Sequence, residues 1–295
     1  MTEGHFVRAV LRNGRLETAS DARPVIWWSL TKSVIAAAAL RLVDLGRLTL
    51  DEPVANRPYS LRHLLQHTAG VPTYRGPEYH DAVARGDPPW SSEKMLQWVR
   101  SDTLLFPPGE GWAYSNIGYY FVSRMIEAAT GEALGPALRS LVLDPLGLAA
   151  TGIVTTPEDL EPTVWGNPTG YHPGWVYHGL LTGPAEEAVR FVHGVGALLG
   201  EELWAAMLTV HHVGGDMPGR PWMEPHYSLG LMIGAWREAG RVYGHSGVGF
   251  TVAAVYAFPD LPGAPVVGAF APGSDETVVE NEALKLAMDQ QAPPL

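Results

Sequence analysis

Cysteine is absent from the 295 residues of this chain. Its absence excludes a disulfide, a thiolate nucleophile and a cysteine-ligated metal site. Lysine is almost as scarce, because the basic residues are nearly all arginine and the only lysines are Lys32, Lys94 and Lys285. A lysine inside a catalytic pattern is therefore a candidate for chemistry rather than one more surface charge.

Positive charge is in deficit overall, with a formal net charge of -11 at pH 7 and no basic stripe. An acidic chain repels phosphate groups, which argues against a nucleic-acid or anionic-membrane partner. No uninterrupted apolar stretch is long enough to span a bilayer. The first residues, Met1–Arg8, lack the basic start, apolar core and cleavage site of a secretory signal, so we expect a cytoplasmic protein if Met1 is the native start.

What the chain does contain is enough apolar material for a large core. Hydrophobic residues make up 46% of it, and the length allows one large domain or two interlocked ones. Asn13-Gly14 lies between short alternating segments and predicts a hairpin. Helical patterns broken by Pro/Gly loops, including the connection from Tyr74 to Trp90, occupy residues from about 50 to 165.

The last third of the chain has a different pattern. Two amphipathic stretches occupy residues 185–209, and His211 and His212 after them are expected in a loop. From Tyr227 onward strands and turns alternate. A final helix is expected from about Glu276 to Gln290.

The most informative local pattern is Ser29-Leu-Thr-Lys32. Residues i and i+3 of a helix share one face, so the lysine amine lies within hydrogen-bond reach of the serine hydroxyl. The segment from Ser29 to Leu45 is apolar almost all round, which predicts a buried helix. Burial depresses the pKa of a lysine, so Lys32 is expected to act as a base near neutral pH.

A second copy of this pattern, Ser91-Ser-Glu-Lys94, has a different context. It follows a Pro-Pro turn and opens an amphipathic stretch that runs to Arg100. That arrangement is typical of a serine that caps a surface helix, and we interpret Ser91 or Ser92 in this way.

The string Tyr114-Ser-Asn116 follows a turn-rich segment and precedes a helical pattern from Ile117 to Thr130. The tyrosine and the asparagine are therefore expected on a tight loop at a helix start, where side chains can point into a cleft. The alternative is that Ser115 or Asn116 is only the N-cap and that Tyr114 fills the core.

The string His245-Ser-Gly247 precedes a strong β pattern from Phe250 to Phe258. A glycine beside strands allows a ligand to approach the backbone closely. Similar strings at His172 and His212 lie before a proline and before a Gly-rich loop, so neither context favours a strand.

Together, and in this order, the three strings resemble the serine β-lactamase and penicillin-binding-protein superfamily, in particular its class C-like branch of D-peptidases, amidases and esterases. Connecting segments agree, since Phe106-Pro-Pro-Gly109 and Pro145-Leu-Gly-Leu148 are similar to segments of the family. The resemblance covers about residues 25 to 275.

This resemblance implies an α/β (α+β) fold of the β-lactamase/transpeptidase type. Residues 1–50 and 170–295 are expected to form an antiparallel sheet flanked by helices. Residues 51–169 are expected to form a mainly helical subdomain, with the active site at the interface of the two parts.

The resemblance also implies a mechanism that these residues can carry. Ser29 Oγ attacks a carbonyl carbon, Lys32 and Tyr114 share the general-base role, and Tyr114 returns the proton to the leaving group. Which of the two bases takes the first proton stays open. Asn116 is expected to hydrogen-bond Lys32 or a substrate amide, and the backbone N–H groups of Ser29 and Val248 are expected to form the oxyanion hole.

The third string departs from the β-lactamase pattern. Many β-lactamases carry Lys-Thr-Gly there, whereas this chain has His245, Ser246 and Gly247, which we expect to bind substrate. The change favours an esterase, amidase or peptidase with weak or no β-lactamase activity. Because histidine is only partly charged at neutral pH, recognition of a carboxylate is expected to strengthen as the pH falls.

Tryptophans and histidines near the strings are further candidates. Trp27, Trp28 and Trp112 are expected either to wall an apolar acyl pocket, with Trp112 against the substrate, or to pack in the core. His63 and His67 have the i, i+4 spacing of a zinc helix, but the glutamate that a metalloprotease needs is missing, so we interpret them as structural. No metal and no cofactor are expected.

Two classes of function remain open, both acting on a small-molecule acyl substrate. The first is a hydrolase that forms an acyl-enzyme on Ser29 with an ester, amide or D-amino-acid peptide, or a transferase that passes the same acyl group to an amine or alcohol. The second is a penicillin-recognising binding or sensor module that acylates and stalls. Deacylation separates the two classes, and the oligomeric state is left open.

Overall fold

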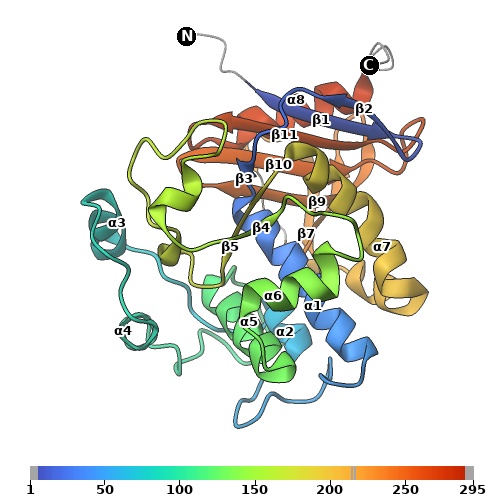
Figure 1. Ribbon diagram of the computed structural model, residues 1–295. Helices are drawn as coiled ribbons and strands as arrows, with labels where there is room; N and C mark the ends of the chain where they lie inside the picture. The colour runs from blue at the N-terminus through green and yellow to red at the C-terminus, as the bar shows by residue number, and fades with distance from the viewer. Residues whose placement is uncertain (1–5, 214, 216, 290–295) are drawn as a thin grey trace.

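The computed structural model describes residues 6–213, 215 and 217–289. Its largest element is an eight-stranded sheet in which every neighbouring pair of strands is antiparallel. In sheet order the strands are β2 (Arg15–Ala19), β1 (Val7–Arg12), β11 (Val266–Pro272), β10 (Thr251–Ala257), β9 (Gly240–Val248), β8 (Met232–Trp236), β7 (Trp222–Tyr227) and β6 (His211–His212). The sheet therefore combines the start of the described chain, blue in Figure 1, with its last third, orange to red.

Helices cover both faces of this sheet. In chain order the helices of the described chain, including those away from the sheet, are α1 (Thr31–Asp44), α2 (Leu61–Leu65), α3 (Pro77–Ala84), α4 (Ser92–Trp98), α5 (Asn116–Thr130), α6 (Leu134–Leu138), α7 (Ala185–Met207) and α8 (Glu276–Met288). Helix α8 packs against β10 and β11 from one side, whereas α7 packs against β1, β10 and β11 from the other (Figure 1). In the described part of the chain, no helix has both the length and the apolar content that a bilayer crossing requires.

Strand β10 divides the core into two layers. Alternate residues of a strand point to opposite faces, and Val252, Ala254 and Tyr256 pack in the apolar cluster that contains α8 residues. Ala253 and Val255 pack in the cluster that contains α1 and α7 residues. Burial on both faces explains why this strand is apolar at nearly every position after Thr251.

The hairpin expected at Asn13-Gly14 joins β1 and β2. Both turn residues have positive φ, 50° for Asn13 and 72° for Gly14, as a type I′ hairpin turn requires. Strand β1 then pairs with β11, with Val10 opposite Val267. This pairing brings the two ends of the described chain into one sheet.

Helix α1 is buried on all sides, as its apolar sequence predicts. Every residue from Thr31 to Leu40 is buried, because α1 packs between α7 and α5. A lysine in the first turn of such a helix is desolvated. The helix begins later than expected, since Ser29 lies in a preceding 3-10 turn, η1 (Trp28–Leu30).

A second sheet, with the antiparallel order β3-β5-β4, lies beside this turn. Its strands are β3 (Val25–Ile26), β5 (Leu180–Gly183) and β4 (Gly152–Val154). Trp27 N donates a hydrogen bond to Leu181 O over 3.0 Å. The small sheet therefore holds the chain directly before Ser29.

Several expected elements are confirmed and two are corrected. The two stretches expected at 185–209 are the two parts of α7, which breaks at Gly200 with φ 75° and ψ 171°. The connection from Tyr74 to Trp90 contains a helix, α3, and His211 and His212 form an edge strand, β6, rather than a loop. The expected architecture, an antiparallel sheet flanked by helices with a mainly helical part beside it, is confirmed.

Candidate active site

Ser29 is held by an unusual backbone conformation at the preceding residue. Trp28 has a φ of 44°, a value that bulky residues rarely adopt. Its indole Nε1 donates a hydrogen bond to Thr251 Oγ1 over 2.8 Å, and its ring packs edge-on against Phe250 and Tyr171. These contacts hold Trp28 in place and so set the direction of the Ser29 side chain.

Lys32 supplies an amine next to the Ser29 hydroxyl. Its Nζ lies 3.2 Å from Ser29 Oγ and 3.1 Å from His178 Nε2, and the lysine is 0% exposed. Desolvation by burial holds the pKa of Lys32 well below its usual range. The amine therefore has a lone pair available to accept a proton near neutral pH, as its desolvated position predicts.

Tyr114 reaches the same two residues from the loop before α5. Its ring centroid lies 5.0 Å from Lys32 Nζ, and its phenol shares a hydrogen bond with Ser29. Burial raises the pKa of Tyr114, and the hydrogen bond with Ser29 offsets only part of that rise. The phenol is therefore protonated at neutral pH.

The start of α5 fixes the residues that follow Tyr114. Ser115 is the N-cap, as one of the two interpretations held, and its Oγ accepts a hydrogen bond from Gly118 N over 2.9 Å. Asn116 N donates to Thr73 Oγ1 over 3.1 Å, and Asn116 lines the cavity beside Ser29. Among the described residues, no hydrogen bond joins Asn116 and Lys32. Of the two roles expected for Asn116, its position in the cavity wall favours the hydrogen bond to a substrate amide.

Gly247 lies against the backbone of the nucleophile. A Cβ at this position would lie 2.7 Å from Ser29 N and 2.6 Å from Trp28 Cβ. Neither neighbour can move without displacing η1, so the close approach requires glycine. Glycine in the third string is thus explained by packing between β9 and η1.

The N–H of Val248 is free of the β9–β10 ladder. Gly249 N donates to Thr251 O over 3.0 Å, and hydrogen-bonded pairs alternate along an antiparallel ladder. The Val248 N–H therefore points away from β10. Strand β8 pairs with β9 only as far as Gly244, so this N–H lies on the open side of β9, and Val248 and Ser29 line the same cavity.

His245 is buried rather than presented to a substrate. It is 1% exposed, its Nε2 lies 2.9 Å from Tyr227 OH, and its Nδ1 lies 2.5 Å from Ser246 O. A carbonyl oxygen only accepts hydrogen bonds, so Nδ1 carries the proton and Nε2 accepts from the tyrosine. Burial, with a further contribution from Lys32, lowers the pKa of His245 to about 3. The expectation that this histidine is partly charged near neutral pH is therefore wrong.

Three buried histidines, His67, His178 and His245, are expected to make the fold less stable in mild acid. Burial lowers the pKa of each below the usual 6.5, so below about pH 6.5 the unfolded chain binds more protons than the folded protein. The stability that the three neutral histidines contribute is fully present above that pH and is lost as the pH falls. Lowering the pH from 8 to 6 should reduce the free energy of unfolding by about 1 kcal/mol per histidine, measured by urea unfolding.

The control for this prediction is a variant that removes one of the three groups. In His245→Gln, the loss of unfolding free energy between pH 8 and pH 6 should be smaller by about a third. In His193→Gln, at an exposed position of α7, this loss should equal that of the wild type. A pH dependence that is the same in both variants would show that other groups cause it.

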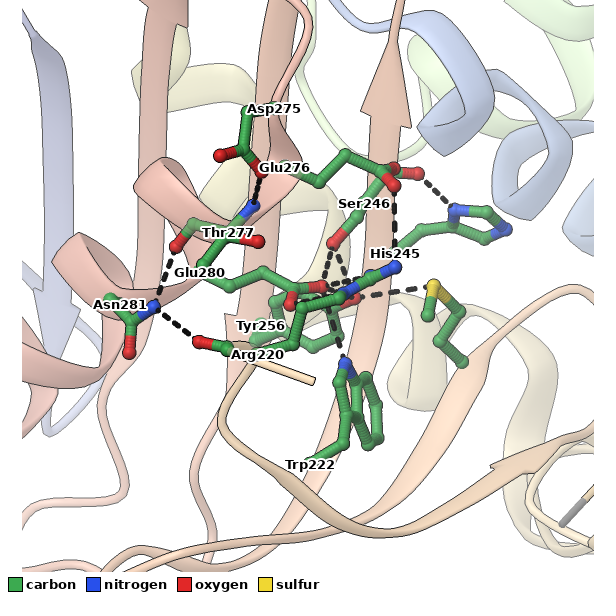
Figure 2. A network of polar contacts seen from close by, with 12 residues as sticks. Arg220, Trp222, His245, Ser246, Tyr256, Asp275, Glu276, Thr277, Glu280 and Asn281 are labelled. Atoms are coloured by element: carbon green, nitrogen blue, oxygen red, sulfur yellow. Dashed lines mark hydrogen bonds and ion pairs between the residues drawn. The ribbon is translucent and has the colours of Figure 1, made fainter. Parts of the chain in front are cut away.

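Ser246 faces the opposite side of β9 from His245, as alternation along a strand requires. Its Oγ donates to Glu280 Oε1 over 2.5 Å and lies 2.7 Å from Tyr256 OH, and Glu280 pairs with Arg220 (Figure 2). The Ser246 side chain is 1% exposed. It belongs to a buried network between β9 and α8, so the expectation that it binds substrate is corrected.

A cavity of about 730 Å³ opens beside Ser29. Much of its wall is apolar or aromatic, formed by Trp28, Tyr74, Tyr79, Tyr171, Val248 and Phe250. Among the described residues that line it there is no arginine and no lysine. The cavity therefore suits an uncharged, largely apolar group placed next to the nucleophile.

Only one of the three candidate tryptophans lines this cavity. Trp28 does so, whereas Trp27 is 0% exposed and packs in the core. Trp112 packs behind the site, against the rings of His67 and Tyr114. Trp112 therefore packs against Tyr114 and does not line the cavity, so the expected contact of Trp112 with substrate is corrected.

The competing motifs have structural roles, as expected. Ser91 is the N-cap of α4, and its Oγ accepts a backbone N–H from the first turn. His63 Nδ1 accepts from Ser60 N over 3.1 Å, and His67 Nδ1 accepts from Ser115 N over 3.0 Å. Within residues 6–213, 215 and 217–289, no cluster of three or more His, Asp or Glu side chains suits a metal ion.

His178 is a site residue that the sequence patterns did not indicate. It lies 146 positions from Lys32 along the chain and just before β5, separated from it by Gly179. It belongs to none of the three strings, and a single histidine before a strand carries no signal of its own. Only the packing of the small sheet against α1 reveals it.

Comparison with known proteins places this arrangement among related sequences. Residues 7–289 match the family described as Beta-lactamase. Esterase EstB of Burkholderia gladioli is 33% identical over 169 residues, which are 50% of this chain and 41% of that protein. Lovastatin esterase of Penicillium rubens is 25% identical over 244 residues, 68% of this chain and 58% of that protein. The matches thus span about half the length of these relatives.

Solved structures agree in fold over nearly the whole chain. The D-amino acid amidase from Ochrobactrum anthropi SV3 has a TM-score of 0.78 at 20% identity, covering 96% of this chain and 94% of that one. The D-stereospecific amidohydrolase from a Streptomyces species has a TM-score of 0.75 at 21% identity, covering 94% and 93%. At these identities the likeness concerns the fold.

Proposed function

Because the chain belongs to the β-lactamase family, we propose that it is a serine hydrolase that forms an acyl-enzyme on Ser29. The observation that carries the proposal is the contact between Lys32 Nζ and Ser29 Oγ, at 3.2 Å, beside an open cavity. A buried amine with a depressed pKa is a base suited to this hydroxyl near neutral pH.

Acylation is then divided between Lys32 and Tyr114. As Ser29 Oγ bonds to the carbonyl carbon, its proton passes to Lys32 Nζ. The protonated phenol of Tyr114 donates to the leaving group and regains a proton from Lys32. The N–H groups of Ser29 and Val248 stabilise the negative charge on the carbonyl oxygen. In deacylation a water molecule takes the place of the leaving group, and the proton transfers run in reverse.

The proposed substrate is an ester, or an amide that includes D-amino-acid derivatives, with an apolar group beside the reacting carbonyl. The aromatic wall of the cavity supports this choice, as do the esterase and amidase names of similar proteins. Asn116 lies where its side-chain amide can hydrogen-bond an amide of the substrate. A neutral His245 supplies no cation for a carboxylate, so we expect weak or no β-lactamase activity.

The test is to incubate the protein with p-nitrophenyl butyrate, D-phenylalanine p-nitroanilide and a chromogenic cephalosporin. We expect repeated turnover of the ester or the anilide and little turnover of the cephalosporin. Acid quenching, followed by mass spectrometry of the intact protein and its peptides, should find the acyl group on the peptide that contains Ser29.

Each other outcome identifies a different function. A stoichiometric adduct on Ser29 without turnover would replace the hydrolase by a binding or sensor module. Faster product release with an added amine or alcohol, together with the acylated acceptor, would indicate an acyltransferase. No adduct and no turnover with any substrate would contradict the proposal. The cytoplasmic location stays a prediction.

A further inference from the structure

His178 contacts the amine of Lys32 but belongs to none of the three strings, and nothing in the proposed reaction uses it yet. We propose that His178 is a positioning residue whose Nε2 accepts a hydrogen bond from Lys32 Nζ, so that the lone pair of the amine is directed at Ser29 Oγ. This inference rests on the proposed acyl-enzyme chemistry of Ser29.

The direction of this hydrogen bond follows from the lone pair that the amine needs. A neutral amine has two N–H bonds and one lone pair. To accept the Ser29 proton, Lys32 must direct the lone pair at Ser29 Oγ, 3.2 Å away, so it meets His178 Nε2, 3.1 Å away, with an N–H. Nε2 of His178 must therefore be unprotonated, and the ring proton lies on Nδ1.

The surroundings keep His178 neutral and in place. The side chain is 2% exposed, and the peptide carbonyl of His178 accepts a hydrogen bond from Ser123 Oγ over 2.8 Å. Burial lowers the pKa of His178, and repulsion from any positive charge on the nearby Lys32, His67 and His245 lowers it further. An uncharged ring retains the lone pair on Nε2 that the amine requires.

The other acceptors around the amine are already engaged. His67 Nδ1 accepts from Ser115 N, and His245 Nε2 accepts from Tyr227 OH. Tyr119, whose ring lies 5.8 Å from Lys32 Nζ, donates its hydroxyl to Leu65 O. Among the described residues, Ser29 and His178 are the hydrogen-bond partners of Lys32 Nζ.

The same contact stabilises the charge that develops during the reaction. When the Oγ–H bond of Ser29 breaks and the Nζ–H bond forms, Lys32 becomes an ammonium in a desolvated site. A hydrogen bond from an ammonium is stronger than one from a neutral amine. His178 Nε2 is therefore expected to favour the protonated amine as Ser29 Oγ bonds to the carbonyl carbon, and so to lower the barrier to acylation.

The buried position of His178 lowers the stability of the fold. His178 Nδ1 is buried and has no hydrogen-bond partner within the described residues. An unpaired buried polar atom opposes folding, and such local conflicts are expected mainly where a residue has a function. A histidine placed for packing alone would not need to bring Nε2 to the amine.

Two substitutions separate positioning from packing. His178→Phe keeps a ring of similar size without an acceptor, and His178→Gln keeps an acceptor oxygen of similar reach. With the ester or anilide that the wild type turns over, we expect the phenylalanine variant to lose about 10- to 100-fold in kcat with little change in KM. The glutamine variant should recover most of that loss, and His193→Phe, on the exposed side of α7, should match the wild type.

A second measurement does not depend on turnover, and its first part does not need the phenylalanine variant. Long-range proton–nitrogen NMR of the wild-type protein labelled on histidine reports which ring nitrogen of His178 carries the proton, with the signal assigned from its loss in His178→Gln. Because the chain has only three lysines, nitrogen-labelled lysine also reports the titration of Lys32 directly. The pKa of Lys32 should be higher in the wild type than in His178→Phe, since the ammonium loses its acceptor in that variant.

The outcomes separate this inference from the proposed function. An unprotonated Nε2, with loss in the phenylalanine variant and recovery in the glutamine variant, supports the inference. A protonated Nε2, or a folded phenylalanine variant with wild-type kcat, overturns it even when the ester is hydrolysed. If no substrate is turned over, the proposed function fails, and the protonation state of Nε2 still decides whether the hydrogen bond exists.

Discussion

Replacing Ser29 by alanine is expected to lower kcat/KM for the ester or anilide by about 10⁴-fold or more. The reason is that no other hydroxyl of the site shares its contacts: Ser29 Oγ meets the amine of Lys32 at 3.2 Å and the phenol of Tyr114. The loss should lie in kcat, because the cavity that binds the substrate is left intact. Steady-state kinetics measures the change, and the acyl adduct should disappear from the intact mass.

The chain provides a matched control for this substitution. Ser91 belongs to the second serine–lysine pattern, yet its Oγ accepts from Lys94 N over 3.2 Å and caps α4. Ser91→Ala should therefore leave kcat unchanged and cost about 1 kcal/mol of unfolding free energy through the lost cap. Equal activity in Ser29→Ala and the wild type would contradict the nucleophile assignment.

The parts of the site that follow from local chemistry could be predicted from the sequence. Ser29 and Lys32 are separated by three positions at the start of an apolar helix, so spacing alone brings their side chains together and burial alone depresses the pKa of the amine. For Gly247 the sequence indicates a close approach to the backbone, but it assigns that approach to a substrate, whereas the structure places the backbone of Trp28 and Ser29 there.

The parts that depend on the three-dimensional path of distant segments could not be predicted. His178 lies in the loop that leads into β5 of the small sheet, and no periodicity connects it with Lys32. The orientation of the third string depends on how β9 pairs: its register directs His245 toward Tyr227 and Ser246 toward α8. A shift of one residue would exchange the two faces, and the sequence has no signal that distinguishes these registers.

The burial of His245 has a consequence for the choice of substrate. A histidine at the surface of the cavity would be partly charged near neutral pH, but this one has a pKa of about 3 because burial disfavours its charged form. Lys32 is uncharged for the same physical reason. The histidine to which a motif comparison would assign carboxylate recognition is thus neutral, which directs the proposed substrate toward uncharged esters and amides.

Removal of the Glu280 carboxylate is expected to destabilise the fold by about 3–5 kcal/mol, because Glu280→Ala takes the fully buried partner away from the largely buried Arg220. Glu280 is 0% exposed and pairs with Arg220, whose side chain is 16% exposed. Ser246 Oγ and Trp222 Nε1 also donate to the same carboxylate (Figure 2). The variant therefore leaves Arg220 with only the longer contact to Glu276, at 3.3 Å, and removes the carboxylate acceptor of Ser246 and Trp222.

The control is an ion pair of the same type at the surface. Arg241 and Asp260 form a contact with Arg241 77% exposed, so Asp260→Ala should cost little unfolding free energy. Urea unfolding of both variants and the wild type at pH 8 measures the difference. A Glu280 variant that loses no more stability than the Asp260 variant would show that the buried pair is solvated.

A double substitution distinguishes two quantities: the unfolding free energy lost when one charge of the pair is left behind, and the net contribution of the whole pair to stability. Replacing a buried pair by apolar residues of similar volume is often neutral or stabilising, so Arg220→Met in combination with Glu280→Leu should recover much of the loss of Glu280→Ala. Recovery will be incomplete, since Ser246 and Trp222 still lack the carboxylate. Ser246 lies next to Gly247 in β9, and Gly247 packs against the backbone of Ser29. If the double variant still shifts Ser246, the shift should therefore move the backbone beside Ser29 and lower kcat.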